Sequence, residues 1–236
     1  MKTQKLIFRQ LFDKESSTYT YLLADPQTKE AALIDPVKEN INRDLRLLKE
    51  LDLELKYIMD THVHADHITA SNELRDKTGA QTVLNSDANV TCNNISLNDY
   101  EKLFLGKFEI IGMKTPGHTG GCMSYLVENK ILTGDSLLIR GTGRTDFQQG
   151  DSSEMFNSIQ KKIFDLPDET MVYPGHDYNG HTVSTVGEEK KYNPRIKLGV
   201  TEKEYVQTMK NLKLAEPKHI HTAVPANLNC GKTQNI

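Results

Sequence analysis

Residues 61–67 read Thr-His-Val-His-Ala-Asp-His and follow directly on an apolar strand predicted over residues 55–60. Residues two apart on an extended segment point to the same side, so His62 and His64 can face one pocket. Three imidazoles and a carboxylate within six residues are costly to bury without a partner, and a metal ion is their commonest partner. A solvated histidine-rich loop is the alternative, but the strand before the motif and the helix predicted after it favour the metal.

Three later motifs, TPGHT, TGDS and YPGHDY, have the same design. Each places a ligand-capable side chain (His118, Asp135 or His176) after a predicted strand, beside a Gly or Pro that shapes a tight turn. Taken alone, each of these side chains is more often structural than a metal ligand. All the motifs end their strands in the same way, however, and ligands collect at strand ends in sheet-based enzymes. The sequence therefore predicts one metal site assembled from several strand ends.

The rest of the chain predicts a layered α/β fold in which strands and helices alternate in two halves. An amphipathic helix over residues 40–51, for example, places Ile41, Leu45, Leu48 and Leu51 on one face. Further helices are predicted over residues 70–77, 153–164 and 201–212. Strands are predicted over residues 5–8, 19–24, 30–34, 55–60, 81–84, 123–127, 130–133 and 169–173, with two more within 102–114.

Composition excludes several classes of function. The chain has 236 residues, of which 37% are hydrophobic and 26% charged, and this fits one globular domain over residues 1–236. A net charge of −3 leaves no basic excess for nucleic acid. The apolar runs are far shorter than the ~20 residues that span a bilayer, and the N-terminus has no apolar signal segment, so we expect neither a membrane nor secretion. Cys92, Cys122 and Cys230 are widely spaced and form no CxxC motif, which favours reduced thiols in a cytoplasmic protein.

The chain resembles the metallo-β-lactamase fold superfamily in the order of its motifs: HxHxDH, then a lone His, then a lone Asp, then a lone His. The resemblance implies an αβ/βα four-layer sandwich. In two-metal members, the residues that match His62, His64 and His118 hold one metal. Those that match Asp66, His67 and His176 hold the other, and the residue that matches Asp135 bridges the two.

Longer segments are similar to the persulfide dioxygenases, the family of the ethylmalonic encephalopathy protein. They are FRQLFDKESSTYTYLLAD (8–25), LIDPV (33–37), THVHADHITAS (61–71), TPGHTGGC (115–122), TGDSLLIRGTGRTDFQQG (133–150), YPGHDYNGHTVSTVGEE (173–189) and AVPANLNCG (223–231). The piece RGTGRTDFQQG is the most discriminating, because glyoxalase II keeps the metal pattern but resembles this piece less. A cysteine that some relatives carry there is Thr142 here, which argues against redox regulation at that position but not against the metal site.

The family resemblance implies one Fe(II) per chain, held by His62, His118 and Asp135. Two histidines and one carboxylate form the facial triad of non-haem Fe(II) oxygenases, which leaves positions open for O2 and substrate. The implied substrate is glutathione persulfide, which O2 oxidises to sulfite and glutathione. No GxSxG motif or catalytic-looking cysteine indicates a protein nucleophile.

Four more donors of the pattern are present: His64, Asp66, His67 and His176. The sequence alone permits a second metal at these residues, whereas the resemblance implies that they orient the iron ligands. Asp177 is expected to orient a neighbouring group, such as a ligand histidine.

Glutathione carries two carboxylates, so its pocket should offer cationic and hydroxyl anchors. Arg144 and Tyr178 match positions that the family uses near its pocket, and Arg195 is a weaker candidate. The alternatives are an ion pair between Arg144 and Asp146, and simple packing of Tyr178.

Two other functions stay open at this point. One is a dinuclear zinc hydrolase of the glyoxalase II type that acts on a glutathione thioester. The other is a non-catalytic persulfide carrier or sensor with a vestigial metal site, although the intact metal pattern counts against it. A homodimer is carried over from relatives. Cys230 fits the family pattern and is expected to be a packed structural thiol.

Overall fold

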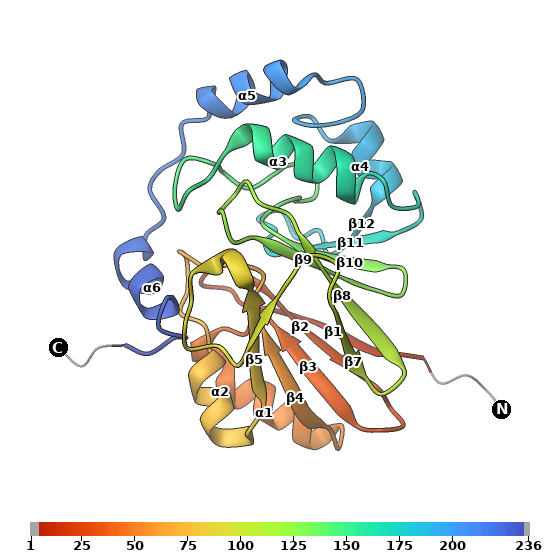
Figure 1. The fold of residues 1–236 in the computed structure, drawn as a ribbon, viewed down its shortest axis with the longest axis vertical. Coiled ribbons are helices and arrows are strands. Elements are labelled where there is room, and N and C mark those ends of the chain that lie inside the picture. Colours follow the sequence, from red (N-terminus) through yellow and green to blue (C-terminus); the bar gives the residue numbers. More distant parts are fainter. Residues whose placement is uncertain (1–4, 234–236) are drawn as a thin grey trace.

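The strands form two six-stranded sheets, and the computed structural model describes residues 5–233 (Figure 1). The first sheet has the order β1-β2-β3-β4-β5-β6 and the second β12-β11-β10-β9-β8-β7. The strands of the first sheet are β1 (Ile7–Phe12), β2 (Tyr19–Ala24), β3 (Glu30–Ile34), β4 (Glu54–Met59), β5 (Gln81–Asn85) and β6 (Ile95–Leu97). Those of the second are β7 (Lys102–Leu105), β8 (Phe108–Lys114), β9 (Met123–Val127), β10 (Lys130–Gly134), β11 (Met171–Pro174) and β12 (Ser184–Thr185).

The α-helices are α1 (Ile41–Glu50), α2 (Ser71–Thr78), α3 (Ser152–Ser158), α4 (Val186–Tyr192), α5 (Glu202–Asn211) and α6 (Ile220–Asn227). Helices α1 and α2 lie on the outer side of the first sheet and α3, α4 and α5 on that of the second, whereas α6 lies to one side of both sheets (Figure 1). Helices α1 and α2 pack on the first sheet, where Leu48 and Leu74 share a buried cluster with Ile58 of β4. Helix α3 packs on the second sheet and α5 packs on α3, where Met155 and Tyr205 share a buried cluster with Ile131 of β10. The order of layers is therefore helix, sheet, sheet, helix, as the sequence predicts.

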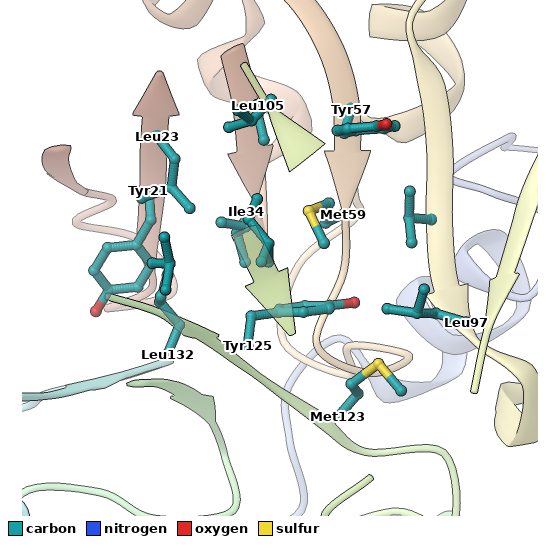
Figure 2. Close-up of a cluster of buried hydrophobic side chains, with 14 of the residues drawn as sticks. Tyr21, Leu23, Ile34, Tyr57, Met59, Leu97, Leu105, Met123, Tyr125 and Leu132 are labelled. Carbon is teal, nitrogen blue, oxygen red and sulfur yellow. The ribbon is translucent and has the colours of Figure 1, made fainter. Parts of the chain in front are cut away.

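The main core lies between the two sheets (Figure 2). Its side chains come from the inner faces of both sheets and are removed from water, which is the largest favourable term in folding. Buried tyrosines need hydrogen-bond partners, and here the partners lie at strand ends. The Tyr21 hydroxyl donates to the carbonyl of Pro174 at 2.6 Å, and the Tyr125 hydroxyl donates to that of Asp60 at 2.9 Å. The core thus fixes the strand ends from which the candidate site is built.

Most predicted elements are confirmed, and the differences have local causes. Strand β1 runs over Ile7–Phe12 rather than residues 5–8, because it pairs with β2 along its whole length. The helix predicted over 153–164 consists of α3 and a π-helical turn over Ile159–Ile163. The elements β6, β12, α4 and α6 were not predicted from the sequence. The first three are short, and α6 contains Pro225, which is unfavourable within a helix.

The prediction of three reduced thiols is wrong for two of them. Cys92 and Cys230 form a disulfide with a Cα–Cα distance of 6.0 Å, although 138 residues separate them in sequence. Cys122 is free and buried. The pairing was not predictable because it depends on where the C-terminal segment docks, and the spacing of the cysteines carries no information about that docking. Cys230 is therefore a disulfide cysteine and not a packed free thiol.

Across residues 5–233, every helix falls short of the length and apolar character that a membrane span requires.

Candidate metal centre

The predicted ligands lie in turns that follow strand ends of both sheets. His62 and His64 follow β4 of the first sheet, whereas His118, Asp135 and His176 follow β8, β10 and β11 of the second. Strands β10 and β11 are parallel neighbours, so their carboxyl ends meet at one edge of the sheet. The fold thus brings together side chains that lie far apart in sequence.

His62, His118 and Asp135 form one group of candidate ligands, whose donor atoms lie within 4.8 Å of one another. The rings of His62 and His118 are nearly perpendicular, at 87°, with their centroids 4.9 Å apart. His118 Nε2 lies 3.6 Å from Asp135 Oδ2. Two imidazoles and one carboxylate can therefore converge on a single ion.

His64, Asp66 and His67 form a second group, again with donor atoms within 4.8 Å of one another. His176 lies between the two groups. Its Nε2 is 3.6 Å from Asp66 Oδ2 and 3.7 Å from Asp135 Oδ1. The structure therefore brings all seven residues of the predicted pattern into one cluster.

Four atoms of this cluster are buried without a hydrogen-bond partner in the described part of the chain. They are His64 Nδ1, His67 Nε2, Asp135 Oδ1 and His176 Nδ1. A buried polar atom without a partner costs about 1–3 kcal/mol, so such atoms are rare unless a ligand satisfies them. Imidazole nitrogens and carboxylate oxygens are also the donors that zinc and iron take in proteins. These residues therefore fit a metal ion.

The outer ring nitrogens of the first group are held by hydrogen bonds. His118 Nδ1 donates to the carbonyl oxygen of Arg144 at 2.7 Å. His62 Nδ1 lies 3.0 Å from the Thr61 hydroxyl. Metal-binding histidines commonly use one nitrogen in this way, which fixes the ring and leaves the other nitrogen for the metal.

The protonation states also suit metal binding. Burial lowers the pKa of His62 and His64 well below that of free imidazole, and neighbouring histidines lower it further. Burial alone would raise the pKa of Asp66 and Asp135, but the surrounding histidines outweigh burial and hold both pKa values below the usual range. Metals bind neutral imidazoles and ionised carboxylates, so these ligands need lose no proton at neutral pH.

Two buried carboxylates beneath the cluster were missed by the sequence analysis. Asp35 accepts hydrogen bonds from the Thr61 N–H at 2.7 Å, the Thr61 hydroxyl at 2.9 Å and His64 Nε2 at 3.0 Å. Burial raises the pKa of Asp35 to about 6 and that of Asp60 to about 7. The signal that could have revealed them is a carboxylate directly after an apolar strand, at the ends of β3 and β4.

A cavity of about 610 Å³ opens above the cluster. Asp66, His118, Asp135 and His176 line it together with the predicted anchors, and this volume is in the range of small-molecule sites. One wall of the cavity comes from the segment between α5 and α6 and was not predicted from the sequence. Its lining residues are Leu214, Ala215, Pro217, Lys218 and His219.

Arg144, Tyr178 and Arg195 all line the cavity. Arg144 makes a two-pronged ion pair with Asp146 at 2.6 and 2.8 Å and donates to the Ala215 carbonyl at 2.6 Å. Its side chain thus holds the 214–219 wall in place. Arg195 Nη1 donates to the carbonyl of Thr142 at 2.6 Å.

Tyr178 and Asp177 lie in the turn after β11. The Tyr178 side chain is 73% exposed and stacks on His176, with ring centroids 5.9 Å apart and planes 3° from parallel. Asp177 Oδ1 accepts the backbone N–H groups of Asn179 and His181 at 2.8 and 2.7 Å. Asp177 therefore shapes the turn that carries Tyr178, and these hydrogen bonds do not go to a ligand histidine.

The turn before His118 gives a first prediction. Gly117 has φ +138°, and a Cβ there would lie 2.3 Å from the backbone of Met155 at the start of α3. We expect Gly117→Ala to lower the melting temperature by several degrees, because the clash and strain cost on the order of 1–3 kcal/mol. Gly120→Ala is the matched control, since a Cβ there meets its first neighbour at 3.5 Å. Equal melting temperatures for both variants in calorimetry would contradict this reading.

The chain matches the family model described as the metallo-β-lactamase superfamily over residues 13–107 and 99–176. It is 45% identical over 229 residues to the mitochondrial persulfide dioxygenase ETHE1 of Homo sapiens and 44% identical to that of Mus musculus. Each alignment covers 96% of this chain and 89% of the relative.

Solved structures agree with these matches. The crystal structure of ETHE1 from Myxococcus xanthus is 50% identical, has a TM-score of 0.94, and covers 96% of this chain and 100% of its own. A metallo-β-lactamase from Staphylococcus aureus is 25% identical with a TM-score of 0.88 and covers 96% and 73%. The α/β fold predicted from the sequence is thus confirmed.

Proposed function

Because the chain belongs to the persulfide dioxygenase family of the metallo-β-lactamase superfamily, we propose that it oxidises glutathione persulfide with O2 to sulfite and glutathione. The observation that carries this proposal is the identity of 44–50% to persulfide dioxygenases over 96% of the chain. The cluster supports the proposal, because Asp135 Oδ1 is buried without a partner and Asp135 forms one group of candidate ligands with His62 and His118.

We propose that His62, His118 and Asp135 hold one Fe(II) per chain. The support is their grouping within 4.8 Å and the low pKa values of His62 and Asp135. Fe(II) in a two-histidine, one-carboxylate site supplies redox-active positions at which O2 and a sulfur ligand can react side by side. The protein contributes by fixing the rings through Thr61 and the Arg144 carbonyl.

We propose that His64, Asp66, His67 and His176 shape and orient this site rather than hold a second ion. Asp66 Oδ2 already accepts hydrogen bonds from the Thr18 hydroxyl at 3.0 Å and from His67 Nδ1 at 2.8 Å. The negative charge of Asp66 raises the pKa of His67 despite burial, which favours a charged pair. Metal stoichiometry distinguishes this arrangement from the dinuclear zinc alternative.

The cavity supports a tripeptide substrate with carboxylates. Arg144, Arg195 and Lys218 are cationic side chains that line it, and the Arg144 guanidinium is paired with Asp146. Tyr178 adds an exposed aromatic ring and hydroxyl beside His176. We propose that Arg144, Tyr178 and Arg195 bind the glutathione part, so that the terminal sulfur points at the cluster.

No protein nucleophile is part of the proposal. The one free cysteine among the described residues, Cys122, is buried, and burial raises its pKa to about 12. Its thiol lies against the N–H and hydroxyl of Thr119 at 3.3 and 3.2 Å. A thiol this hard to ionise attacks substrate poorly.

The test is elemental analysis of anaerobically purified protein together with an oxygen-electrode trace. We expect about one iron per chain, O2 consumption on addition of glutathione persulfide, and sulfite as product. Two zinc ions per chain, no O2 consumption and hydrolysis of a glutathione thioester would replace the proposal with the glyoxalase II-type activity.

Arg144→Ala separates substrate binding from metal binding. We expect the KM for glutathione persulfide to rise about tenfold or more, because a charged hydrogen-bonding group is lost. Iron content should not change, since His118 is held by the backbone carbonyl of Arg144, which alanine keeps. Steady-state kinetics and elemental analysis measure both. Loss of iron in this variant would assign Arg144 to the structure of the site instead.

A cytoplasmic location and a homodimer stay predictions. The mammalian relatives are named as mitochondrial proteins. Cell fractionation checks the location, and light scattering on the purified protein checks the oligomeric state.

A further inference from the structure

One buried side chain of the C-terminal helix is bonded to the backbone of the metal-binding loop. Asn227, the last residue of α6, is 4% exposed. Its Nδ2 donates to the carbonyl oxygens of His64 at 2.9 Å and His67 at 2.8 Å. Its Oδ1 accepts the N–H of Thr69 at 2.9 Å. The side-chain amide of Asn227 thus satisfies the hydrogen bonding of three backbone groups in the loop that follows His62.

These three groups are buried together with their residues. His64, His67 and Thr69 are 1%, 5% and 3% exposed, so water cannot readily replace the amide. The two carbonyls belong to His64 and His67 of the second group, and the His64 ring lies against the ring of the proposed ligand His62, with centroids 4.1 Å apart. Asn227 therefore fixes the backbone from which these side chains project.

Helix α6 is itself held firmly at its C-terminal end. Figure 1 shows the chain leaving α5 on the second-sheet side and crossing to α6 near the first sheet. Three residues beyond Asn227, Cys230 forms the disulfide to Cys92, and its carbonyl accepts the N–H of Asn72 at 3.0 Å. Gly231 follows with φ +84°, where a Cβ would lie 2.1 Å from the Thr69 carbonyl oxygen. The anchorage leaves the Asn227 amide little room to shift relative to the loop.

We propose that Asn227 is a positioning residue of the metal centre, through which α6 sets the metal affinity of the loop over residues 62–69. The inference rests on the metal site proposed above but not on the dioxygenase reaction. Its mechanism is preorganisation: the loop is held in its metal-binding shape before the ion arrives. Partners outside the ligand set commonly change metal affinity by 10–100-fold.

The test measures metal affinity with Zn(II) alone, in competition with a chromophoric chelator, on the full chain. We expect Asn227→Ala to raise the Kd for Zn(II) about 10–100-fold. Asn227→Asp should act in the same direction, because a carboxylate keeps the acceptor but cannot donate to the two carbonyls.

Asn193→Ala is the matched control. Asn193 is also fully buried, and its Nδ2 donates to the Gly141 carbonyl at 3.0 Å and to Glu189 at 2.8 Å, outside the metal-binding loop. We expect this variant to lower the melting temperature of the metal-free protein without changing the Kd. If Asn227→Ala also lowers only the melting temperature and leaves the Kd within about twofold of wild type, Asn227 has a merely structural role and the proposal is overturned.

A measurement on the wild-type protein keeps the proposal testable if the variants do not fold. Coupling between two sites is reciprocal, so Zn(II) should slow amide hydrogen exchange at Thr69 and across residues 220–230. Unchanged exchange in these segments on metal binding would refute the coupling. Metal binding without O2 consumption would refute the dioxygenase proposal alone, and a wild-type chain that binds no metal would refute both.

Discussion

His118→Ala and Asp135→Ala are each expected to lose both bound iron and O2 consumption with glutathione persulfide. Each change removes one of the three proposed ligands and leaves two to hold the ion. The expected fall in turnover is on the order of 1,000-fold or more, because the metal provides the reactive positions. Elemental analysis and an oxygen electrode, applied to protein purified without air, measure both effects.

His221→Ala is the control for these two variants. His221 is an exposed histidine of α6 whose Nε2 lies 3.2 Å from Glu216, and it has no part in the cluster. Iron content and turnover should stay at the wild-type level. If His118→Ala or Asp135→Ala keeps full iron content and turnover, the ligand assignment is wrong. Loss of iron in both, with circular dichroism unchanged, would support it.

The parts of the site that the sequence predicted are those encoded locally. A ligand such as His62 or Asp135 follows an apolar strand and stands in a turn marked by neighbouring residues, so its type and place can be recognised within a few positions. The sheet order then brings the turns together, and this follows from the fold that the whole pattern resembles.

The parts that could not be predicted depend on contacts between distant segments. Asn227 is 163 residues from His64, and asparagine in a short helix carries no sign of a buried amide bridge. The helix itself contains Pro225, which argues against a helix when only the sequence is known. Asp35 appeared in the quoted LIDPV segment, but its role depends on His64 lying above it.

The disulfide between Cys92 and Cys230 also depends on contacts between distant segments, and its loss is expected to have a large effect on stability. Linking Cys92 to Cys230 closes a loop of well over one hundred residues in the unfolded chain, for which chain-entropy models give about 4–5 kcal/mol of stability. We expect reduction of the wild-type protein to lower its melting temperature by roughly 10 °C. Calorimetry with and without a phosphine reductant measures the change. Cys92→Ser should melt at the lower temperature under both conditions.

Thiol titration tests whether the disulfide forms, whatever the size of the shift in melting temperature. Denatured but unreduced protein should show one free thiol, that of Cys122, and all three cysteines should titrate after reduction. Three thiols before reduction, with equal melting temperatures in both conditions, would show that the bridge does not form in solution. The result also bears on the predicted cytoplasmic location, because cytosolic thiols are kept reduced and a stable bridge favours an oxidising compartment. Since Cys230 anchors the end of α6, a reduced chain that also binds Zn(II) more weakly would link this bridge to the metal-binding loop through Asn227.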